Sequence, residues 1–321
     1  MDSPRPTRGA PAEELLELVH GVARELVLRD EAPTGNWVEE TVRELRSGVK
    51  TGFYSPPTGG GGLGFRSERG AISFGHVHAA AGPDAPARAL ALCEALLDTL
   101  PVPVRSISIG FTGLTSDQEA SLARDLERRP GSRLIPRLAM ERVLRSQDGE
   151  GLPPAPDALR PVAVREVTLE ALTQLDQRAF RGTTDELLIG SEPDEYRRAL
   201  RAILDGAVGR FLDEASVALY RPDPPLLAGA LLTSEKTPRR AVFQDLMVDP
   251  DLRGRGHGAY LLHWGLRALW ALGYERVRLW VSADNEVARR LYDSVGFSVT
   301  QTAVIYRWDR SPAAPQPQSA R

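Results

Sequence analysis

One order of predicted strands and helices occurs twice along this chain of 321 residues, and no other feature constrains the fold as strongly. Alternating apolar residues predict strands, and apolar residues spaced three or four apart predict helices. Corresponding elements of the two halves lie roughly 170 residues apart. The pairs are 71–77 with 242–248, 87–97 with 258–272, 104–109 with 277–281, 117–128 with 286–295, and 133–139 with 297–308. This recurrence indicates a diverged tandem repeat of one α/β domain.

Further patterns complete each half of the repeat. They are helices at 13–27, 37–46, 169–180 and 195–207, and strands at 162–167, 216–220, 226–233 and 241–248. Turn residues separate the last three strands and predict an antiparallel meander. The predicted fold class is mixed α/β of the α+β type, with a central, mostly antiparallel sheet flanked by helices in each domain.

A cluster of Gly and Pro at 149–156 separates the two halves and predicts a linker. We therefore predict a first domain at 1–150, a linker at 151–160 and a second domain at 161–310. Residues 311–321 lack apolar side chains to bury, which predicts a disordered tail.

The charge balance argues against binding to nucleic acid or to an anionic membrane. The chain carries 40 basic and 43 acidic side chains, a formal net charge of -3. Residues 1–13 carry Pro, Arg and Glu in place of a continuous apolar stretch, and no run approaches ~18 apolar residues, so neither a signal peptide nor membrane contact is expected. Cys93 is the only cysteine, which excludes an intrachain disulfide and fits a reducing cytoplasm. With only two lysines, the arginine-rich composition suggests a G+C-rich bacterial genome.

The chemically informative segment is 246–259, where an apolar strand ends and a glycine-rich turn leads into a helix. Gly254, Gly256 and Gly258 lack Cβ atoms, so successive backbone N–H groups can approach an anion at the positive end of the helix. A pyrophosphate suits such a site, and the alternative is an exposed arginine-rich loop. The Gly-Lys-Ser/Thr ending of a Walker loop is absent, and a dinucleotide fold places its glycines after the first strand of a βαβ unit.

Two motifs occur in order in the second half. The first is Arg-x-x-Gly-x-Gly, from Arg253 to Gly258, after a strand that ends in an apolar-x-Val segment. The second is Asn-x-x-Ala-x-x-Leu-Tyr-x-x-x-Gly-Phe, from Asn285 to Phe297. In both motifs, and in their order, residues 161–308 resemble the GCN5-related N-acetyltransferases (GNATs).

The resemblance implies that acetyl-CoA binds in a V-shaped opening between the strands 246–248 and 277–281, without a metal. The residues implied to contact it are Leu246, Met247 and Val248 on the strand; Arg253, Gly254, Arg255, Gly256, His257, Gly258 and Ala259 around the pyrophosphate; and Asn285, Ala288 and Leu291 beside the pantetheine. An amine would attack the thioester directly. Tyr292 matches the tyrosine that, in many relatives, protonates the departing thiolate. Its alternative role is that of a packed helix tyrosine.

The general base is less well indicated. Many relatives carry Glu six residues before the motif valine, and that position is Val242 here. Asp245 is the nearest carboxylate, but counting with a period of two from Val242 places it on the opposite face, and Gln244 on the face of the site. A strand bulge would reverse that order. A structural role for Asp245, or a water chain as base, stays open.

Asp185 and Glu186 follow the first helix of the second domain, in a region that often covers the acceptor site in this family. They are predicted to attract a cationic amine, and the alternative is a helix start capped by Asp185. The expected partner is a small-molecule amine acceptor. Whether the chain is a monomer or a homodimer is left open.

The first half lacks the features that imply acetyl-CoA binding. No Arg-x-x-Gly-x-Gly spacing follows the strand 71–77, and Pro83 and Pro86 remove N–H donors where phosphates would need them. The helix 117–128 contains no tyrosine. We predict a degenerate copy, in a layout distantly similar to that of the mycothiol synthases.

The resemblance as a whole implies an acetyl-CoA-dependent N-acetyltransferase acting on a primary amine of a small molecule in a ternary complex. Two alternatives stay open. One is an acetyl-CoA-binding sensor or scaffold without transfer activity, and the other is an acetyltransferase for protein lysines or N-termini.

Overall fold

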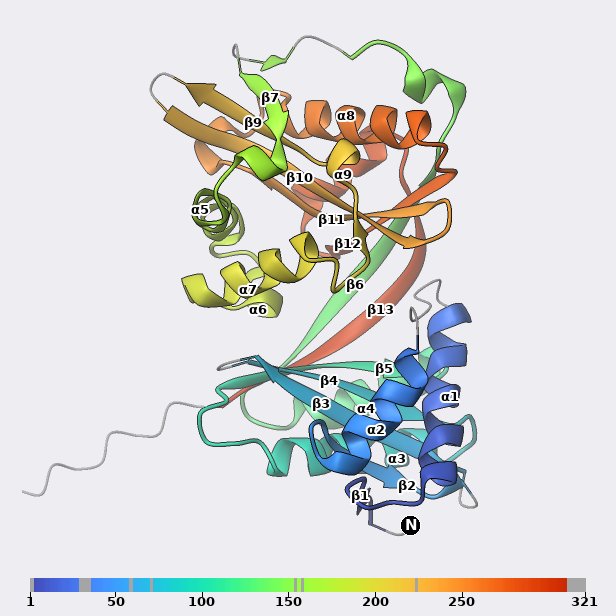
Figure 1. The fold of residues 1–321 in the computed structure, drawn as a ribbon. Coiled ribbons are helices and arrows are strands. Elements are labelled where there is room, and N and C mark those ends of the chain that lie inside the picture. Colours follow the sequence, from blue (N-terminus) through green and yellow to red (C-terminus); the bar gives the residue numbers. More distant parts are fainter. Residues whose placement is uncertain are drawn as a thin grey trace, which may run out of the picture. The chain divides into compact units, whose positions relative to one another are not determined.

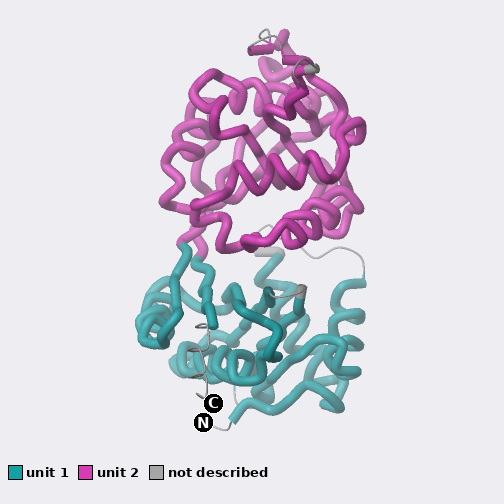
Figure 2. Tube along the Cα trace, turned by 90° about the vertical axis from the view of Figure 1, so that its left-hand side faces the viewer, with its two compact units in different colours: residues 1–135, 304–321 teal, residues 136–303 magenta. Residues whose placement is uncertain are grey.

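The computed structural model describes residues 3–28, 36–57, 60–69, 72–152, 155–156, 159–222 and 225–310. The chain divides into two compact units: Met1–Ile135 with Val304–Arg321 form unit 1, and Pro136–Ala303 form unit 2 (Figure 2). The division between the units therefore differs from the predicted boundary at residue 150. The predicted tail 311–321 and part of the predicted linker 151–160 lie outside the described residues.

Unit 1 contains strands in the order β1-β2-β3-β4-β5-β13 (Figure 1). The elements are β1 Arg5–Pro6, α1 Ala12–Leu28, α2 Trp37–Ser47, β2 Thr51–Ser55, β3 Gly62–Arg69, β4 Ile72–Ala79, α3 Ala85–Asp98, β5 Ser106–Thr112, α4 Ser116–Glu127 and the end of β13 Ser298–Asp309. Among the described strands of this unit, β4 and β5 pair in parallel and the other pairs are antiparallel. Helices α3 and α4 share a core with β4 and β5, while α1 and α2 share one with β2 and β3.

Unit 2 contains strands in the order β6-β12-β11-β10-β9-β7. The elements are β6 Ser132–Val143, β7 Arg160–Ala163, α5 Leu169–Phe180, α6 Glu186–Ile189, α7 Pro193–Leu204, β8 Arg210–Phe211, β9 Val217–Pro222, β10 Pro225–Thr237, β11 Arg240–Val248, α8 His257–Ala271, β12 Arg276–Ser282 and α9 Glu286–Ser294. Helix α8 packs on one face of β9–β12, and α5 and α7 pack on the other (Figure 1).

Local sequence signals account for where several helices begin. Thr115 accepts a hydrogen bond from the Gln118 N–H before α4, and Thr168 accepts one from the Ala171 N–H before α5. Such side-chain acceptors satisfy backbone donors that have no partner in the first helical turn. The helices predicted from periodicity are all confirmed, with small shifts at their ends.

Two strand predictions were wrong or incomplete. The strand predicted at 162–167 ends at Ala163 and is followed by a short 3-10 helix, Val164–Glu166. In the first half, β2 and β3 were not predicted, because three glycines interrupt the alternation of apolar residues. Gly62 in β3 is needed for packing, since a Cβ atom there would lie 2.9 Å from Leu92 Cδ1 of α3.

The last strand of each half completes the sheet of the other unit. Residues 137–143 of β6 run antiparallel to β12 within unit 2, and residues 305–309 of β13 run antiparallel to β5 within unit 1. The assignment of 133–139 to the first domain was therefore wrong for residues 136–139, and that of 297–308 to the second was wrong for residues 304–308. Alternation predicts that a segment is a strand, but it does not predict which edge the strand joins.

The two units differ at their central parallel pair. In unit 1, β4 and β5 are paired all the way from Ile72–Ser106 to His78–Thr112. In unit 2, β11 and β12 pair only from Arg240–Arg276 to Val242–Arg278, and they are unpaired beyond that point. The expected opening between parallel strands therefore occurs in unit 2 and not in unit 1.

Candidate functional site

The separation of β11 from β12 leaves an edge of β11 available in unit 2. From Phe243 to Val248, β11 still pairs with β10 on its other side. On the side toward β12 no ladder continues after Val242. Alternate N–H and C=O groups along such an edge can bind an extended, polar ligand.

The glycine-rich turn lies between the end of β11 and α8. Gly254 and Gly256 adopt φ values of +77° and +87°, a region that L side chains rarely occupy. Gly258 is required for a different reason, because a Cβ atom there would lie 2.8 Å from Leu291 Cδ2 of α9. The ring of His257, with Nδ1 2.9 Å from the Leu252 carbonyl oxygen, links the helix start to the turn. The first-turn N–H groups of α8, which includes Ala259, have no intrahelical acceptors and can bind an anion.

The arginines of the turn are used partly within the protein. Arg253 donates to the Ala179 carbonyl oxygen at the end of α5 at 2.5 Å. Arg178 of α5 in turn binds the Asp249 carboxylate at 3.0 Å. Arg255 donates to the Asp251 carbonyl oxygen at 3.4 Å and is mostly exposed. Arg253 thus fastens the turn to α5, and Arg255 is the better placed of the two for an external anion.

The facing wall of the opening is the beginning of α9. Asn285 Oδ1 accepts from the Ala288 N–H at 3.1 Å and caps the helix. Ala288 and Leu291 pack against the same apolar cluster as Leu246 and Val248 of β11. The residues expected to line the acetyl-CoA site are therefore brought together from β11, α8 and α9.

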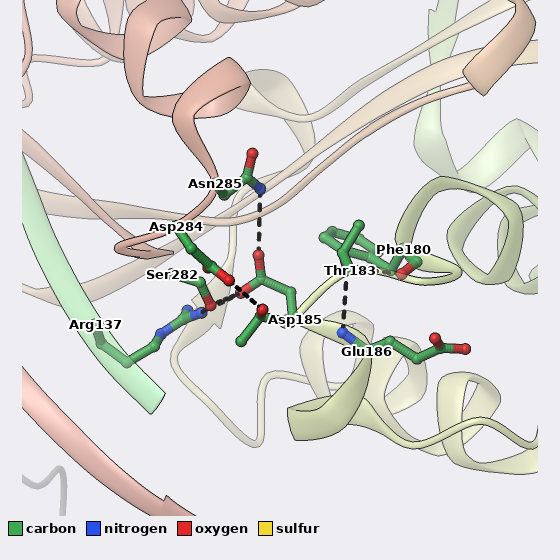
Figure 3. Close-up of polar contacts among 9 residues, drawn as sticks. Arg137, Phe180, Thr183, Asp185, Glu186, Ser282, Asp284 and Asn285 are labelled. Carbon is green, nitrogen blue, oxygen red and sulfur yellow. Dashed lines mark hydrogen bonds and ion pairs between the residues drawn. The ribbon is translucent and has the colours of Figure 1, made fainter. Parts of the chain in front are cut away.

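Asp185 lies at the centre of a polar network in unit 2 (Figure 3). Its carboxylate pairs with Arg137 of β6 and accepts hydrogen bonds from Ser282 Oγ at 2.9 Å and from Asn285 Nδ2 at 3.3 Å. Arg137 also donates to Ser282 Oγ at 2.7 Å. The negative charge that was expected to attract an amine is therefore already matched by Arg137.

Two further contacts hold the loop around Asp185. Thr184 donates to the Asp284 carboxylate, and Glu186 accepts from the Gly182 N–H at 2.7 Å. Glu186 begins the four-residue helix α6. The loop between α5 and α6 is thus fastened to the end of β12 and to the two residues that precede α9 (Figure 3).

Tyr292 lies buried on α9, and its ring centroid is 6.0 Å from the ring centroid of Phe297. Burial is the main cause that raises the pKa of the Tyr292 hydroxyl, and the carboxylates of Asp185 and Asp245 raise it further, while Arg137 lowers it. The hydroxyl therefore keeps its proton at neutral pH and can serve as a hydrogen-bond or proton donor.

A bulge in β11 changes the face on which Asp245 lies. Leu232 of β10 pairs with Asp245 and Thr233 with Phe243, so Gln244 is the inserted residue. The placement of Asp245 and Gln244 by counting with a period of two was wrong for this reason. Gln244 Nε2 donates to the Val208 carbonyl oxygen at 3.2 Å.

Asp245 faces the helix α5, where it interacts with Asp176. Burial, followed by the charge of Asp185, raises the pKa of Asp245 to about 7. Burial and the Asp245 carboxylate raise the pKa of Asp176. Asp176 was missed by sequence reasoning, although it lies four residues after Leu172 on the apolar face of α5, where a carboxylate is unusual.

Comparison with known proteins agrees with this geometry. A model described as "Acetyltransferase (GNAT) family" matches residues 170–297, which include β11, the glycine-rich turn, α8, β12 and α9. Residues 170–297 form a domain of the acetyltransferase (GNAT) family. Over the whole chain, the fold is similar to a GCN5-related N-acetyltransferase from Sphaerobacter thermophilus, with a TM-score of 0.65, 16% identity and 96% of both chains covered.

A tandem GNAT protein from the clavulanic acid biosynthesis pathway is also similar, with a TM-score of 0.61, 13% identity, and 97% of this chain and 99% of that chain covered. The predicted fold of two tandem GNAT-like domains is thereby confirmed. In sequence, a mycothiol acetyltransferase from Propionibacterium freudenreichii is 30% identical over 164 residues, 50% of this chain and 48% of the relative. A second, from Nocardiopsis dassonvillei, is 46% identical over 70 residues, 22% of this chain and 21% of the relative. At most, the chain thus matches about half the length of these curated relatives.

Other candidate features have local structural contacts. His76 Nε2 and His78 Nδ1 lie 2.9 and 3.1 Å from Thr112 Oγ1 on the GNAT-like unit 1 sheet. Within the described ranges, no three His, Cys, Asp or Glu side chains are grouped as ligands for a metal ion. No helix in the described part of the chain combines the length and the apolar character needed to cross a bilayer.

Proposed function

We propose that unit 2 is an acetyl-CoA-dependent N-acetyltransferase that acts on a primary amine of a small molecule. The observation that carries the proposal is the separation of β11 and β12 after Val242, with the glycine-rich turn at the end of β11. Membership of residues 170–297 in the GNAT family supports the same activity. The single cysteine and the bacterial relatives support a reaction in the bacterial cytoplasm.

In this proposal acetyl-CoA follows the free edge of β11. Leu246, Met247 and Val248 bind the pantetheine arm through their backbone groups, and the N–H groups of 254–259 bind the pyrophosphate. Asn285, Ala288 and Leu291 line the opposite wall. The amine attacks the thioester carbonyl carbon directly in the ternary complex, because the two substrates are held in contact.

Tyr292 supplies the proton to the departing thiolate in this scheme. Its burial and raised pKa keep the hydroxyl protonated until charge develops on the sulfur. Asp245 accepts the proton from the attacking amine. The bulge at Gln244 supports this role, because it turns Asp245 away from the α8 face and toward α5.

Unit 1 has a supporting role in the proposal and binds no acetyl-CoA. Continuous pairing of β4 with β5 supports this assignment, since it leaves no free edge like that of β11. Pro83 and Pro86 also lack N–H groups at the start of α3, where a phosphate would need donors.

The acceptor is proposed to be small. The loop 181–186 is fastened to β12 and α9 by Asp185 and Thr184, and a fastened loop leaves less room for a protein substrate than a mobile one. The named mycothiol acetyltransferases make an acceptor of that kind the first to test. Transfer to protein lysines and acetyl-CoA binding without transfer are the competing functions.

The test is calorimetric titration of acetyl-CoA into the full chain, followed by CoA release with a panel of small amines, amino acids, aminoglycosides and peptides. Gly256→Glu should abolish acetyl-CoA binding, because it places a carboxylate and a strained φ in the turn. Gly273→Glu is the matched control, since Gly273 has a similar φ of +79° beyond the far end of α8. An unchanged affinity of Gly256→Glu for acetyl-CoA would contradict the assignment of the site. If the wild-type chain binds acetyl-CoA but transfers acetyl to no amine, an acetyl-CoA sensor is favoured.

A further inference from the structure

Several buried polar atoms in the described part of unit 2 lack hydrogen-bond partners, and Asp176 Oδ1, Asp245 Oδ1 and the Tyr196 hydroxyl are three of them. They come from three different elements, α5, β11 and α7. Asp176 is 1% exposed and Tyr196 is 0% exposed, whereas Asp245 is only partly buried. Buried polar atoms without partners are uncommon in native proteins and call for an explanation, such as a proton or ligand that supplies the missing bond.

The charges around these atoms cannot be balanced by nearby cations. Asp185 and Glu186 add negative charge on the side of α6, and Tyr292 faces the group from α9. Arg137 is already paired with Asp185. The charge of Arg181, which follows α5, lowers the pKa of the Tyr196 hydroxyl. Neither Asp176 nor Asp245 has an ion-pair partner among the described residues, so two adjacent ionised carboxylates would be strongly unfavourable here.

We propose that Asp176 is a positioning residue that stays protonated at neutral pH and donates a hydrogen bond to the Asp245 carboxylate. Asp245 then takes up a different proton, from a cationic primary amine. One proton between the two side chains supplies a partner to both unpaired carboxylate oxygens. The inference rests on the proposed acetyl transfer and names both the proton acceptor and the charge of the acceptor substrate.

The surroundings of Asp176 favour it as the carboxyl that keeps the proton. Asp176 is enclosed between α5 and the sheet, so its ionised form would lose nearly all of its hydration. Burial and the Asp245 charge both raise the pKa of Asp176. Burial and the charge of Asp185 raise the pKa of Asp245 only to about 7, which suits a base that works near neutral pH.

The step balances in protons and charge. The pair with one proton carries a single negative charge and meets an ammonium group with a single positive charge. One ammonium proton moves to Asp245 and later to solvent. The neutral nitrogen forms a bond with the thioester carbon, and the carbon–sulfur bond breaks. The thiolate takes the Tyr292 proton, and the second proton of the nitrogen restores Tyr292.

The test compares wild type with Asp176→Asn, Asp176→Leu and Asp245→Asn in the full chain. Asparagine imitates a protonated aspartate in charge and shape and can still donate to Asp245, while leucine removes the donor. Thr173→Val, a buried change one turn earlier on α5, controls for general disturbance of that helix. The carboxyl carbons of aspartate are followed by 13C NMR as a function of pH, and acetyl-CoA affinity is measured by calorimetry in the same samples.

In wild type, we expect one carboxyl to titrate near pH 7 and a second to stay protonated above it. Asp176→Asn and Thr173→Val should keep the titration near pH 7, and Asp176→Leu should move it up by about one pH unit, because a hydrogen bond to the charged form is lost. With the amine acceptor identified in the panel, the pH below which kcat/KM falls should shift among the variants in the same order as the carboxyl titration. Asp245→Asn should lower kcat/KM by about 100-fold.

Two results would overturn the inference: titration of both carboxyls near pH 4 in wild type, or an Asp176→Asn variant that behaves like Asp176→Leu. The second would mean that a hydrogen bond donated from position 176 does not set the titration of Asp245. If Asp176→Leu does not fold, wild type and Asp176→Asn still decide between these outcomes. Failure of the proposed function is seen separately, as absent acetyl-CoA binding in wild type, which the carboxyl titration does not affect.

Discussion

A single inserted residue determines the chemistry available to Asp245. Without the bulge at Gln244, the side chain would lie on the face of β11 that packs against α8, where Ala241 and Phe243 are buried. With the bulge, Asp245 shares a face with Met247 and meets α5. The sequence contains Asp245 and the motif valine at known spacing, but no local signal predicts that the register shifts between them.

Tyr292→Phe should lower turnover by about 10- to 100-fold and leave the affinity for acetyl-CoA nearly unchanged. The hydroxyl is proposed to act on the departing sulfur, whereas the ring, which packs beside Phe297, is retained in the variant. Single-turnover CoA release and calorimetry provide the two measurements. Normal turnover in Tyr292→Phe would remove Tyr292 from the reaction.

Asp245→Asn should stabilise the fold above pH 7. The pKa of Asp245 is raised in the folded state to about 7. The contribution of its carboxyl to the free energy of unfolding is therefore present at low pH and is lost as pH rises from about 4 to about 7. The variant lacks this loss, and its free energy of unfolding should exceed that of wild type by about 2–4 kcal/mol at pH 8. Urea denaturation at pH 4.5, 6 and 8 checks this prediction, and a constant difference across pH would contradict it.

At the scale of elements, the site depends on how the loop between α5 and α6 is held. Asp185 binds β6 through Arg137, β12 through Ser282 and α9 through Asn285 (Figure 3). The α5–α6 loop, β6 and the β12–α9 segment, which are distant from one another in sequence, are thus joined through one carboxylate. The loop, the end of β12 and the start of α9 should therefore loosen together when this carboxylate loses its partners.

Arg137→Ala should lower the free energy of unfolding by about 3 kcal/mol, because it leaves the Asp185 carboxylate buried without its cation. The double variant Arg137→Ala/Asp185→Asn should recover part of that loss, since the unpaired charge is also removed. Urea denaturation of the two single variants and the double variant measures the coupling. Additive losses would show that the ion pair contributes nothing.

Helices and motifs were predictable from the sequence, while strand partners were not. The spacing of Leu172, Leu175 and Ala179 is sufficient to predict α5, and the glycines of the turn predict its conformation. Arg137 was not predictable as a site residue, because it lies in the first half of the chain. It reaches the site only because β6 pairs with β12, a long-range choice that local patterns do not encode.

At the scale of the whole molecule, the repeat in the sequence and the compact units in space do not coincide. Unit 2 is one continuous segment, Pro136–Ala303, whereas unit 1 is made from both ends of the chain (Figure 2). A cut at residue 150, where Gly and Pro are frequent, would remove β6 from the edge of β12. The composition of a segment is therefore a poor guide to where this chain can be divided.

A fragment of residues 132–303 should fold and bind acetyl-CoA, and a fragment of residues 151–321 should not. The first contains β6 and all of unit 2, while the second leaves the edge of β12 unpaired and lacks Arg137. Circular dichroism melting and acetyl-CoA calorimetry on both fragments measure the difference. Equal folding and binding by the shorter fragment would show that β6 is dispensable.

The exchange of β6 and β13 also affects the order in which the protein can mature on the ribosome. Residues of the first half emerge first, but the β5 edge waits for residues 305–309, which are translated after every element of unit 2. All residues of unit 2 are available for folding once residue 303 has left the exit tunnel. The half of the chain that is made first is therefore the last to be completed, and its β5 edge stays open to wrong partners throughout synthesis.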